Sequence, residues 1–574
     1  MPKKKPENCW TCRLRRKKCD GTQPTCRVCA SLEISCHYSE TQPEWMDGGP
    51  RQQAEAQRRK SEVKLSADRR RKEKVVRRLQ SELLSDPGRD EYHQGVASPL
   101  TTGATPAPDK ESRGFTQSSS ALEATSPGGS TSNVWLSHLN CDYDIGLVVA
   151  FLDHVFPLLS PFYQPSVLEG GRMWLLAVIM RDKVFRLHTN AITSYLLSVI
   201  PCRSETITNT CKLYALEGAQ RQRDLAISHL QSDLSSLITR GIHNNLSETA
   251  TLLTNMVNVL DLERTLADGD EWQIHLEAAL NLIRDLLQDE SGLQGSNWSL
   301  VLRRLSDRSK PAGFDMWSID QAAFRFSVAK LVVFDIVTSS SLGRPPGLLS
   351  HHQELLRGDR DLMDRNPLQL TEVNGCQNWA MALLGEVVAL DAWKKDQEKQ
   401  KTQYRQHLLL RGEDIYTRLN DGLVQLDKCS NSQDNVMTMD SLTSRAPPPP
   451  YVITKLWTFA TLAYLHIVLH GWQPSNREFR HSVFHATELI KQLSPWPLHL
   501  RAQSWPLCVA GCLASEEERP FYQSLESILG ALASFGSIQQ TKRIWKRVWA
   551  DKSDEPRKDV ATCLASCDYK AFLA

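Results

Sequence analysis

Six cysteines near the N-terminus constrain this chain of 574 residues more than any other feature. They follow the pattern C-x2-C-x6-C-x6-C-x2-C-x6-C, one C-x2-C-x6-C unit repeated 17 residues later, and they are Cys9, Cys12, Cys19, Cys26, Cys29 and Cys36. Tetrahedral zinc takes four thiolates, so six thiolates serve two zinc ions only if two of them bridge. The repeat therefore predicts a binuclear zinc cluster whose bridging pair is repeat-equivalent: Cys9 with Cys26, Cys12 with Cys29, or Cys19 with Cys36.

A simpler arrangement uses only part of this set. The first, second, fourth and fifth cysteines have the C-x2-C spacing of a single-zinc ribbon, which would leave the third and sixth as spare thiols. Under this arrangement the equal six-residue gaps between the cysteines would be a coincidence, so the two-zinc cluster is preferred. The remaining cysteines, from Cys141 to Cys567, have no converging histidine and are expected to be ordinary buried thiols. The chain is too long, and its start too polar, for a secreted disulfide framework.

Positive charge is concentrated at the same end of the chain. Residues 1–80 hold 21 Lys and Arg against 10 Asp and Glu, a net charge of +11, and the other residues carry a net charge of −9. The six positions after Cys12 hold five cations and those after Cys29 hold none; the five are Arg13, Arg15, Arg16, Lys17 and Lys18. A basic block predicts a polyanionic partner, nucleic acid or an anionic membrane surface. We expect a short helix starting near the second cysteine to point several of these cations at DNA phosphates and guanine edges.

With these features in place, the segment Cys9–Cys36 resembles the fungal zinc binuclear cluster transcription factors, the Zn2Cys6 class. The cysteine spacing, the basic run RLRRKKCD and the loop proline Pro24 all match. The resemblance implies a DNA-binding domain that holds two zinc ions, with the first and fourth cysteines, here Cys9 and Cys26, as the bridging pair.

The resemblance also implies roles for the basic run. Members of the class read CGG-type triplets through the third and fourth residues after the second cysteine, here Arg15 and Arg16. Lys is common at the latter position, so Arg16 departs from the usual residue there. Arg13 and Lys18 match positions that contact phosphate or pack on the cluster, and Lys17 is expected to attract phosphate as well.

Composition divides the chain into four segments. Residues 1–46 hold the six cysteines, residues 47–85 form a basic linker that can be helical, residues 86–133 form a disordered linker rich in Ser, Thr, Pro and Gly, and residues 134–574 show apolar residues at helical spacing. The predicted fold is a small zinc-organised cluster domain, a disordered linker and a large all-α regulatory domain. Within the last, Leu456–Trp472 contains two histidines and predicts a buried helix rather than a membrane span.

Two connecting segments leave alternatives open. Between residues 51 and 80 there are 12 basic residues against 4 acidic ones, which suits a helix on DNA, a nuclear import signal or a plain linker. Apolar residues in this stretch make fewer than three clean heptads, so a homodimer stays an open alternative. The proline-rich segment Asp427–Pro450 is expected to be a loop between two helical halves.

A second set of motifs resembles the fungal-specific transcription factor domain that follows a WMDGG linker in many of these factors. The motifs are EWMDGG at residues 44–49, FLDHVFPLL and FYQPSVLEGGRMWLL between 151 and 176, and SWPLCVAGCLASEEER with IWKRVW between 504 and 549. Trp, Leu and Phe at helical intervals are also typical of any helical core, so a bound small-molecule effector is left open.

Other function classes fit less well. The chain has no H-E-x-x-H, G-x-S-x-G, P-loop or Rossmann glycine motif, so an enzyme is not expected. The basic arm lacks the aromatics and the amphipathic face of the main alternative, a zinc-ribbon RNA-binding or membrane-surface adaptor. The sequence predicts a nuclear, zinc-dependent, sequence-specific DNA-binding regulator of RNA polymerase II genes, by family resemblance an activator. The expected partners are double-stranded DNA, the nuclear import machinery and the transcription machinery, and no membrane is expected among them. The target genes are guessed to belong to a specialised-metabolite pathway.

Overall fold

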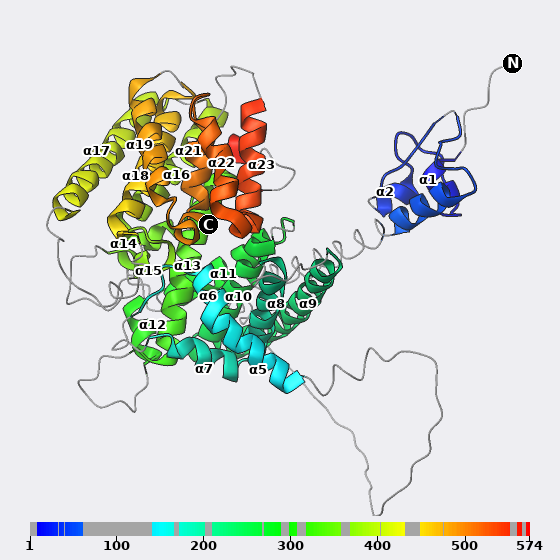
Figure 1. Ribbon diagram of the computed structural model, residues 1–574, viewed down its shortest axis with the longest axis horizontal. Helices are drawn as coiled ribbons and strands as arrows, with labels where there is room; N and C mark the ends of the chain where they lie inside the picture. Colours follow the sequence, from blue (N-terminus) through cyan, green and yellow to red (C-terminus); the bar gives the residue numbers. More distant parts are fainter. Residues whose placement is uncertain are drawn as a thin grey trace, which may run out of the picture. The chain divides into compact units, whose positions relative to one another are not determined.

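The computed structural model describes residues 8–32, 34–39, 41–60, 63, 140–165, 171–200, 209–266, 269–288, 298–306, 317–357, 368–401, 403–430, 448–473, 476–550, 560–564 and 570–573. They belong to two compact units, Met1–Thr125 and Ser126–Ala574, and each unit is described by itself (Figure 1). Within the described residues the regular elements are helices, without a strand. The predicted linker at residues 86–133 lies outside them, as does most of the basic segment after residue 60.

The N-terminal unit is built around thiols. It contains α1 (Trp10–Leu14), α2 (Arg27–Ser31) and a helix at residues 50–60. Its buried cluster consists of four cysteines and one isoleucine: Cys9, Cys12, Cys26, Cys29 and Ile34. So small an apolar core is typical of a domain that depends on bound metal for its stability.

The C-terminal unit is a large assembly of helices, as the apolar periodicity predicts. Its elements are α5 (Asn140–Ala150), the π-helix η1 (Phe151–Val155), α6 (Phe156–Leu159), α7 (Met173–Arg181), α8 (Lys183–Val199), α9 (Asn209–Arg240), α10 (Leu246–Leu266), α11 (Trp272–Leu287), α12 (Trp298–Arg304), α13 (Ile319–Leu342), η3 (Leu349–His351), α14 (His352–Leu355), α15 (Thr371–Asn374), α16 (Asn378–Gln400), α17 (Arg405–Ser430), α18 (Pro450–His470), α19 (Arg477–Leu493), α20 (Pro497–Arg501), α21 (Ser504–Cys512), α22 (Arg519–Leu529), η5 (Gly530–Ser534), α23 (Gly536–Ala550) and α24 (Val560–Leu564).

Helix α13 shows how the sequence sets the ends of a core helix. The side chain of Ser318 accepts the N–H of Gln321 at 3.1 Å, and the Gln321 side chain accepts the N–H of Ser318 at 2.9 Å, which makes a capping box. The helix ends at Leu342 and is capped by Gly343, whose φ of +66° is a conformation that glycine adopts without strain. Between these ends α13 is almost entirely buried and packs against α7, α10, α11 and α16.

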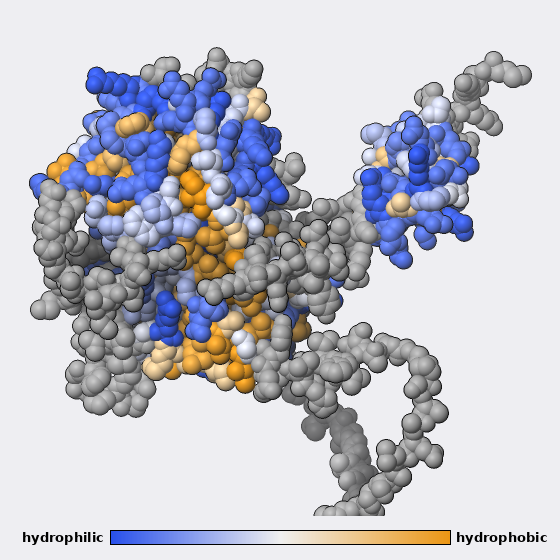
Figure 2. Space-filling view, viewed as in Figure 1, coloured by the Kyte–Doolittle hydropathy of each residue, from blue (hydrophilic) through white to orange (hydrophobic). Residues whose placement is uncertain are grey.

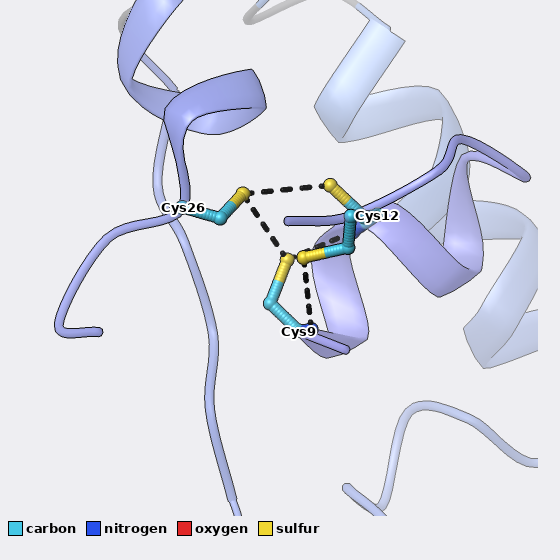
Figure 3. A group of neighbouring side chains, drawn as sticks. Cys9, Cys12 and Cys26 are labelled. Atoms are coloured by element: carbon cyan, nitrogen blue, oxygen red, sulfur yellow. Dashed lines mark hydrogen bonds between the residues drawn. The ribbon is translucent and has the colours of Figure 1, made fainter. Parts of the chain in front are cut away.

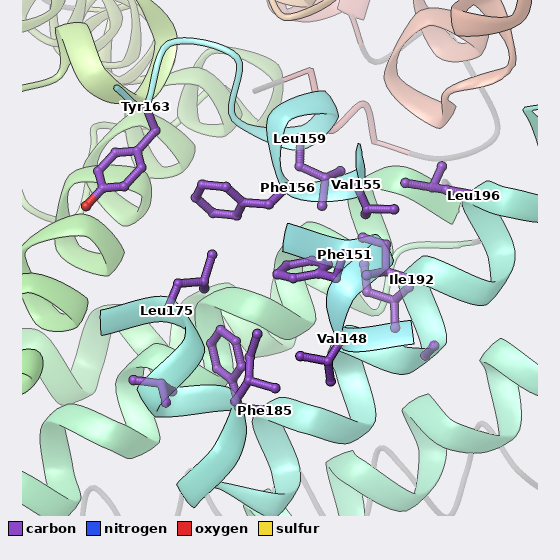
Figure 4. Packing of buried hydrophobic residues seen from close by; sticks show 14 of the residues in the cluster. Val148, Phe151, Val155, Phe156, Leu159, Tyr163, Leu175, Phe185, Ile192 and Leu196 are labelled. Atoms are coloured by element: carbon purple, nitrogen blue, oxygen red, sulfur yellow. The ribbon is translucent and has the colours of Figure 1, made fainter. Parts of the chain in front are cut away.

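Aromatic side chains join the first helices of this unit to α13. Figure 4 shows Phe151 and Phe156 among the apolar residues of one cluster, and Tyr163 lies beside them. The rings of Tyr163 and Phe326 are 4.5 Å apart, and the Trp174 indole donates a hydrogen bond to the Tyr163 hydroxyl at 2.6 Å. Tyr163 and Trp174 of the FYQPSVLEGGRMWLL motif are therefore core residues.

Helix α18 is long and apolar enough to cross a membrane, but 89% of its most apolar window is buried inside the unit. It packs against α16, α17, α19 and α21, so the prediction of a buried helix here is confirmed, although the helix ends at His470. The predicted loop from Asp427 began too early, because α17 continues to Ser430. Asp427 belongs to that helix and forms an ion pair with Lys455 of α18 at 2.5 Å.

In the view of Figure 2 the upper part of this unit is mostly hydrophilic, and apolar side chains form a band down its middle to the lower edge, with smaller patches elsewhere. Exposed apolar residues include two on α5 and three on α7: Ile145, Val149, Met173, Leu176 and Met180. Four cysteines of the unit are buried and outside any disulfide, as predicted for ordinary buried thiols: Cys376, Cys508, Cys512 and Cys563.

Candidate metal centre and nucleic-acid interface

The two cysteine repeats fold in the same way. Cys9 and Cys26 are the N-cap residues of α1 and α2. The Sγ of Cys9 accepts the N–H of Cys12 at 3.2 Å, and the Sγ of Cys26 accepts the N–H of Cys29 at 3.3 Å. The third cysteine of each repeat also matches, because its Sγ accepts the N–H of Cys9 or Cys26 at 3.4 Å. The repeat in sequence is therefore a repeat of structure, and each capping thiol is fixed by a backbone donor.

The six sulfur atoms converge on one place. Figure 3 shows the sulfurs of Cys9 and Cys12 facing that of Cys26, at Sγ–Sγ distances of 3.7 and 3.6 Å. A zinc–thiolate bond of about 2.3 Å gives a tetrahedron with edges of about 3.8 Å, which these distances match. Two sets of four sulfurs each lie within 4.8 Å of one another; one is Cys9, Cys12, Cys19 and Cys26, and the other is Cys9, Cys26, Cys29 and Cys36. The donor set thus fits two tetrahedral ions that share Cys9 and Cys26.

The grouped thiols differ in how readily they ionise. Burial raises the pKa of Cys12 to about 11 and also raises the pKa of Cys9 and of Cys29. Burial acts in the same direction on Cys26, but hydrogen bonds from the Cys29 backbone and neighbouring thiols outweigh it and lower the Cys26 pKa to about 6. Several thiolates at one buried place therefore need positive charge beside them. Two zinc ions would leave a formal net charge of about −2 on the cluster, which nearby cations would stabilise further.

Polar and aromatic side chains connect α1 to the end of the second repeat. The Thr11 hydroxyl donates to the carbonyl of Ser35 at 3.0 Å and accepts the N–H of His37 at 3.1 Å. The Trp10 indole donates to the carbonyl of Ser39 at 3.0 Å. These bonds tie the two repeats together without metal, and sequence reasoning missed both residues because a threonine and a tryptophan between cysteines give no pattern of their own.

The basic run lies mostly beyond α1, which corrects the prediction of a helix starting near the second cysteine. The helix begins two residues before that cysteine, at Trp10, because the Cys9 thiol caps it, and it ends at Leu14. Arg16 has a φ of +53°, a left-handed conformation that cannot continue a helix. The chain then turns back, and the N–H of Lys17 donates to the carbonyl of Cys12 at 2.9 Å.

The charges of this run are available to an outside anion. Arg13, Arg16, Lys17 and Lys18 are exposed, and Arg13 lies against the Trp10 ring at 4.9 Å. Arg15 is half-buried, and one of its guanidinium nitrogens, Nη1, is buried without a hydrogen-bond partner. No ion pair within the described residues engages any of the five. Their positive charge is therefore uncompensated in this part of the unit.

The second repeat presents a different surface. Its cation, Arg27, has an 88% exposed side chain and faces Asp20 at 4.0 Å. Asp20 also accepts the N–H of Arg27 at 2.9 Å, and hydrogen bonding from Thr22, followed by the N–H and charge of Arg27, lowers the pKa of Asp20. The two repeats thus share one thiol framework but differ in charge, as their sequences predict.

The helix at residues 50–60 packs on the cluster. It begins after Asp47, whose carboxylate accepts the N–H groups of Gly49 and Gln52 at 2.8 and 3.2 Å. The guanidinium of Arg59 is held by Glu55 at 2.8 Å and reaches the Ser35 carbonyl at 3.5 Å. The basic linker is therefore helical where it is described, and the acidic cap in EWMDGG is the sequence signal that could have located the start of this helix.

Comparisons with known proteins agree with this geometry. Residues 7–44 match the fungal Zn(2)-Cys(6) binuclear cluster domain, and residues 147–574 match the fungal specific transcription factor domain. The chain is 30% identical to "Transcription factor dibT" of Pestalotiopsis microspora, over 100% of this chain and 99% of that protein. It is 26% identical to "Pestheic acid cluster transcriptional regulator 3" of Pestalotiopsis fici, over 96% and 98% of the two chains. It is 25% identical to "ustiloxin B cluster transcription factor ustR" of Aspergillus flavus, over 90% and 89%.

A search of the solved structures finds no match to this chain. The two matched domains cover the thiol cluster and nearly all of the helical unit. The family resemblance drawn from the cysteine spacing is confirmed, and so is the expectation of two zinc ions. The chain therefore belongs to the fungal specific transcription factors with a Zn(2)-Cys(6) binuclear cluster domain, a domain that binds two zinc ions.

Proposed function

We propose that all six clustered cysteines ligate the two zinc ions and that Cys9 and Cys26 bridge them. The observation that carries this assignment is the pair of four-sulfur sets, which have only these two residues in common. When bound, the ions supply the cross-links between α1, α2 and the segments after them that an apolar core would otherwise supply. The N–H groups of Cys12 and Cys29 hold the two bridging sulfurs in place.

The basic run is the proposed DNA-binding surface. Arg15 and Arg16 read base edges, of CGG-type triplets by family resemblance, and Arg13, Lys17 and Lys18 attract phosphate. The absence of described ion pairs to these five side chains supports the assignment, because an internal partner would have to be given up on binding. The sharp turn at Arg16 favours contact by a short exposed segment rather than by a long helix lying in the groove.

The biological role follows from the domain pair and the relatives. We propose that the protein acts in the nucleus, by binding rather than by catalysis, as an activator of RNA polymerase II genes of one specialised-metabolite pathway. Two of the relatives described above carry the name of a metabolite cluster, pestheic acid and ustiloxin B, in their own names. Entry to the nucleus would use the N-terminal basic clusters. The heptad positions on which a homodimer would depend lie outside the described residues.

Zinc content tests the metal assignment. Native mass spectrometry of the full chain should give two zinc ions, and Cys26→Ser should lose both, because each ion loses a ligand. Cys376→Ser, which changes a buried thiol of the helical unit, should keep both. Loss of a single zinc in Cys26→Ser would refute the bridging role. One zinc in the unmodified chain, with two clustered thiols open to alkylation, would restore the ribbon arrangement and remove the basis for the proposed DNA contacts.

DNA selection tests the basic run, and the second repeat provides the control. Arg16→Ala should cost about 1–3 kcal/mol on the preferred duplex and relax its sequence preference at one position. Arg16→Gly should weaken binding by the same amount, although glycine adopts the left-handed backbone conformation of this position without strain. An equal loss of affinity in the two variants would assign the effect to the missing side chain and not to the backbone. Lys17→Ala should weaken binding to all duplexes and reduce the salt slope by about 0.9. Arg27→Ala, on the other repeat, should change little.

The outcomes separate the roles. Equal weakening of all sequences by Arg16→Ala would make Arg16 a phosphate contact. Arg27→Ala weakening binding as much as Arg16→Ala would move the interface to the second repeat and refute the proposed orientation on DNA.

A further inference from the structure

A cavity of about 190 Å³ lies between α21, α22 and α23 in the helical unit. Its walls are mostly apolar and include Leu507, Leu525, Leu529, Ile538 and Trp545. A single water molecule needs only about 10–15 Å³ of such volume, so the cavity has room for a molecule of one or two rings. Nothing in the zinc cluster or its DNA-binding role uses this cavity.

The aromatic walls are fixed and turn their polar atoms away from the space. The indole N–H of Trp545 donates to the carbonyl of Cys508 at 3.2 Å, and that of Trp549 donates to the carbonyl of Gly511 at 2.9 Å. The hydroxyl of Tyr522 is hydrogen-bonded to Thr487 at 2.9 Å. The two indoles stack with centroids 6.0 Å apart. Because these polar atoms already have partners, the rings can offer carbon surface to a ligand.

The rim of the cavity is cationic. Lys542 and Lys546 line it and lie one turn apart on α23, a helix without an acidic residue. The Lys542 ammonium pairs with the Glu526 carboxylate at 2.7 Å, and hydrogen bonding from Lys542 followed by the charges of both lysines lowers the pKa of Glu526. Lys546 is exposed and forms no ion pair with a described residue. Two lysines thus surround one carboxylate, which leaves a net positive charge at the opening.

We propose that this cavity binds a small aromatic acid whose rings lie against Trp545 and the leucines and whose anionic group pairs with Lys546. Such a ligand would contact three helices at once and couple their positions. A larger groove of about 1080 Å³ lies between α17, α18 and α19, but its rim mixes acids, bases and four histidines without favouring one sign of charge. The smaller cavity is the one whose chemistry selects a class of ligand.

Two related dyes test the proposal on the full-length, zinc-loaded chain. The anionic probe is the two-ring dye 5-(dimethylamino)naphthalene-1-sulfonate, and 5-(dimethylamino)naphthalene-1-sulfonamide is its neutral counterpart. Binding is followed by energy transfer from tryptophan, and folding of every variant by circular dichroism. Lys546→Ala should weaken the anionic dye about fivefold, since one cation a few ångströms from the sulfonate is removed, and should leave the neutral dye unchanged.

Further variants locate the site. Leu525→Trp, which fills the cavity, and Gln523→Trp, which places a ring at an exposed position of the rim, should each abolish binding of both dyes. Arg547→Ala removes an exposed cation from the same helix outside the cavity lining and is the matched control. The proposal is overturned if Gln523→Trp leaves both dyes bound, or if Arg547→Ala weakens the anionic dye as much as Lys546→Ala. It is equally overturned if Lys491→Ala, in the larger groove, has the main effect.

Discussion

One buried carboxylate should control the stability of the helical unit more than any of the cations around it. Asp261 of α10 is paired with Lys330 of α13 and, at 3.0 Å, with Arg264. Arg501 of α20, with 2% of its surface exposed, lies in the same charge cluster. Burial lowers the pKa of Lys330 and lowers that of Arg501 to about 9. Asp261 is thus the anion that attracts three cations with little exposure to water, Lys330, Arg264 and Arg501.

The magnitude follows from this imbalance. Two unit charges at 3.0 Å attract by about 5 kcal/mol at an effective dielectric constant of about 20. Asp261→Asn removes that attraction for two partners and leaves neighbouring cations that repel one another. Breaking a buried pair in this way typically costs about 3–5 kcal/mol, so we expect a loss in that range for Asp261→Asn.

The opposite substitution gives the control. Lys330→Met keeps nearly the same volume and removes one cation, while Asp261 retains Arg264. Replacing a buried cation by an apolar side chain of similar size is often neutral, so we expect a change within about 1 kcal/mol. Urea denaturation of the full chain, followed by tryptophan fluorescence, measures both. Equal losses in the two variants would refute the reasoning, because the ion pair itself and not the excess of positive charge would then set the stability.

Three further predictions concern other positions. Gly511→Ala should destabilise the helical unit by about 2 kcal/mol in thermal denaturation, because the added Cβ would collide with the Trp545 indole, whereas Gly218→Ala, with nothing within 4 Å, should be neutral or stabilising. Burial raises the pKa of Asp335 from 3.8 to about 6, so protonation of this carboxyl favours the folded state. The free energy of unfolding should therefore fall by up to about 3 kcal/mol as the pH rises from below 4 through 6. Asp335→Asn should flatten that part of the stability profile. Thr11→Val should leave the Ser35 carbonyl and the His37 N–H without their partner and speed zinc loss to a coloured chelator; an unchanged rate would show that these two bonds do not hold the cluster.

The sequence was most informative where a pattern has one chemical explanation. Six cysteines at two spacings predicted the thiol cluster, and apolar periodicity predicted the helices of the second unit. Choosing the bridging pair was beyond spacing alone, because all three repeat-equivalent pairs obey the same symmetry. Cys9 and Cys26 are the pair common to both sets of sulfurs, and this is the basis on which we propose them as the bridge.

Other features depended on contacts that spacing does not encode. The start of α1 was predicted two residues too late, because a cysteine is seldom considered as a helix cap, whereas the Cys9 thiol has that role here. The loop after α17 was predicted to start too early, since α17 continues to Ser430, and the contact of Asp427 with Lys455 of α18 joins residues distant in sequence. The cavity between α21, α22 and α23 needed the fold, since its lining comes from residues 507 to 549 on separate helices.

The sharing of Cys9 and Cys26 by both sulfur sets has a consequence for how a cell would sense metal shortage. In the proposed cluster Cys9 and Cys26 each bind both zinc ions, so loss of one ion changes two of the four ligands of the other. The same two thiols also cap α1 and α2. A half-loaded domain would therefore be scarce, and the population would divide into intact and unfolded molecules. Falling zinc would then lower the number of working regulators, while each remaining molecule kept its full affinity and the same choice of target sequence.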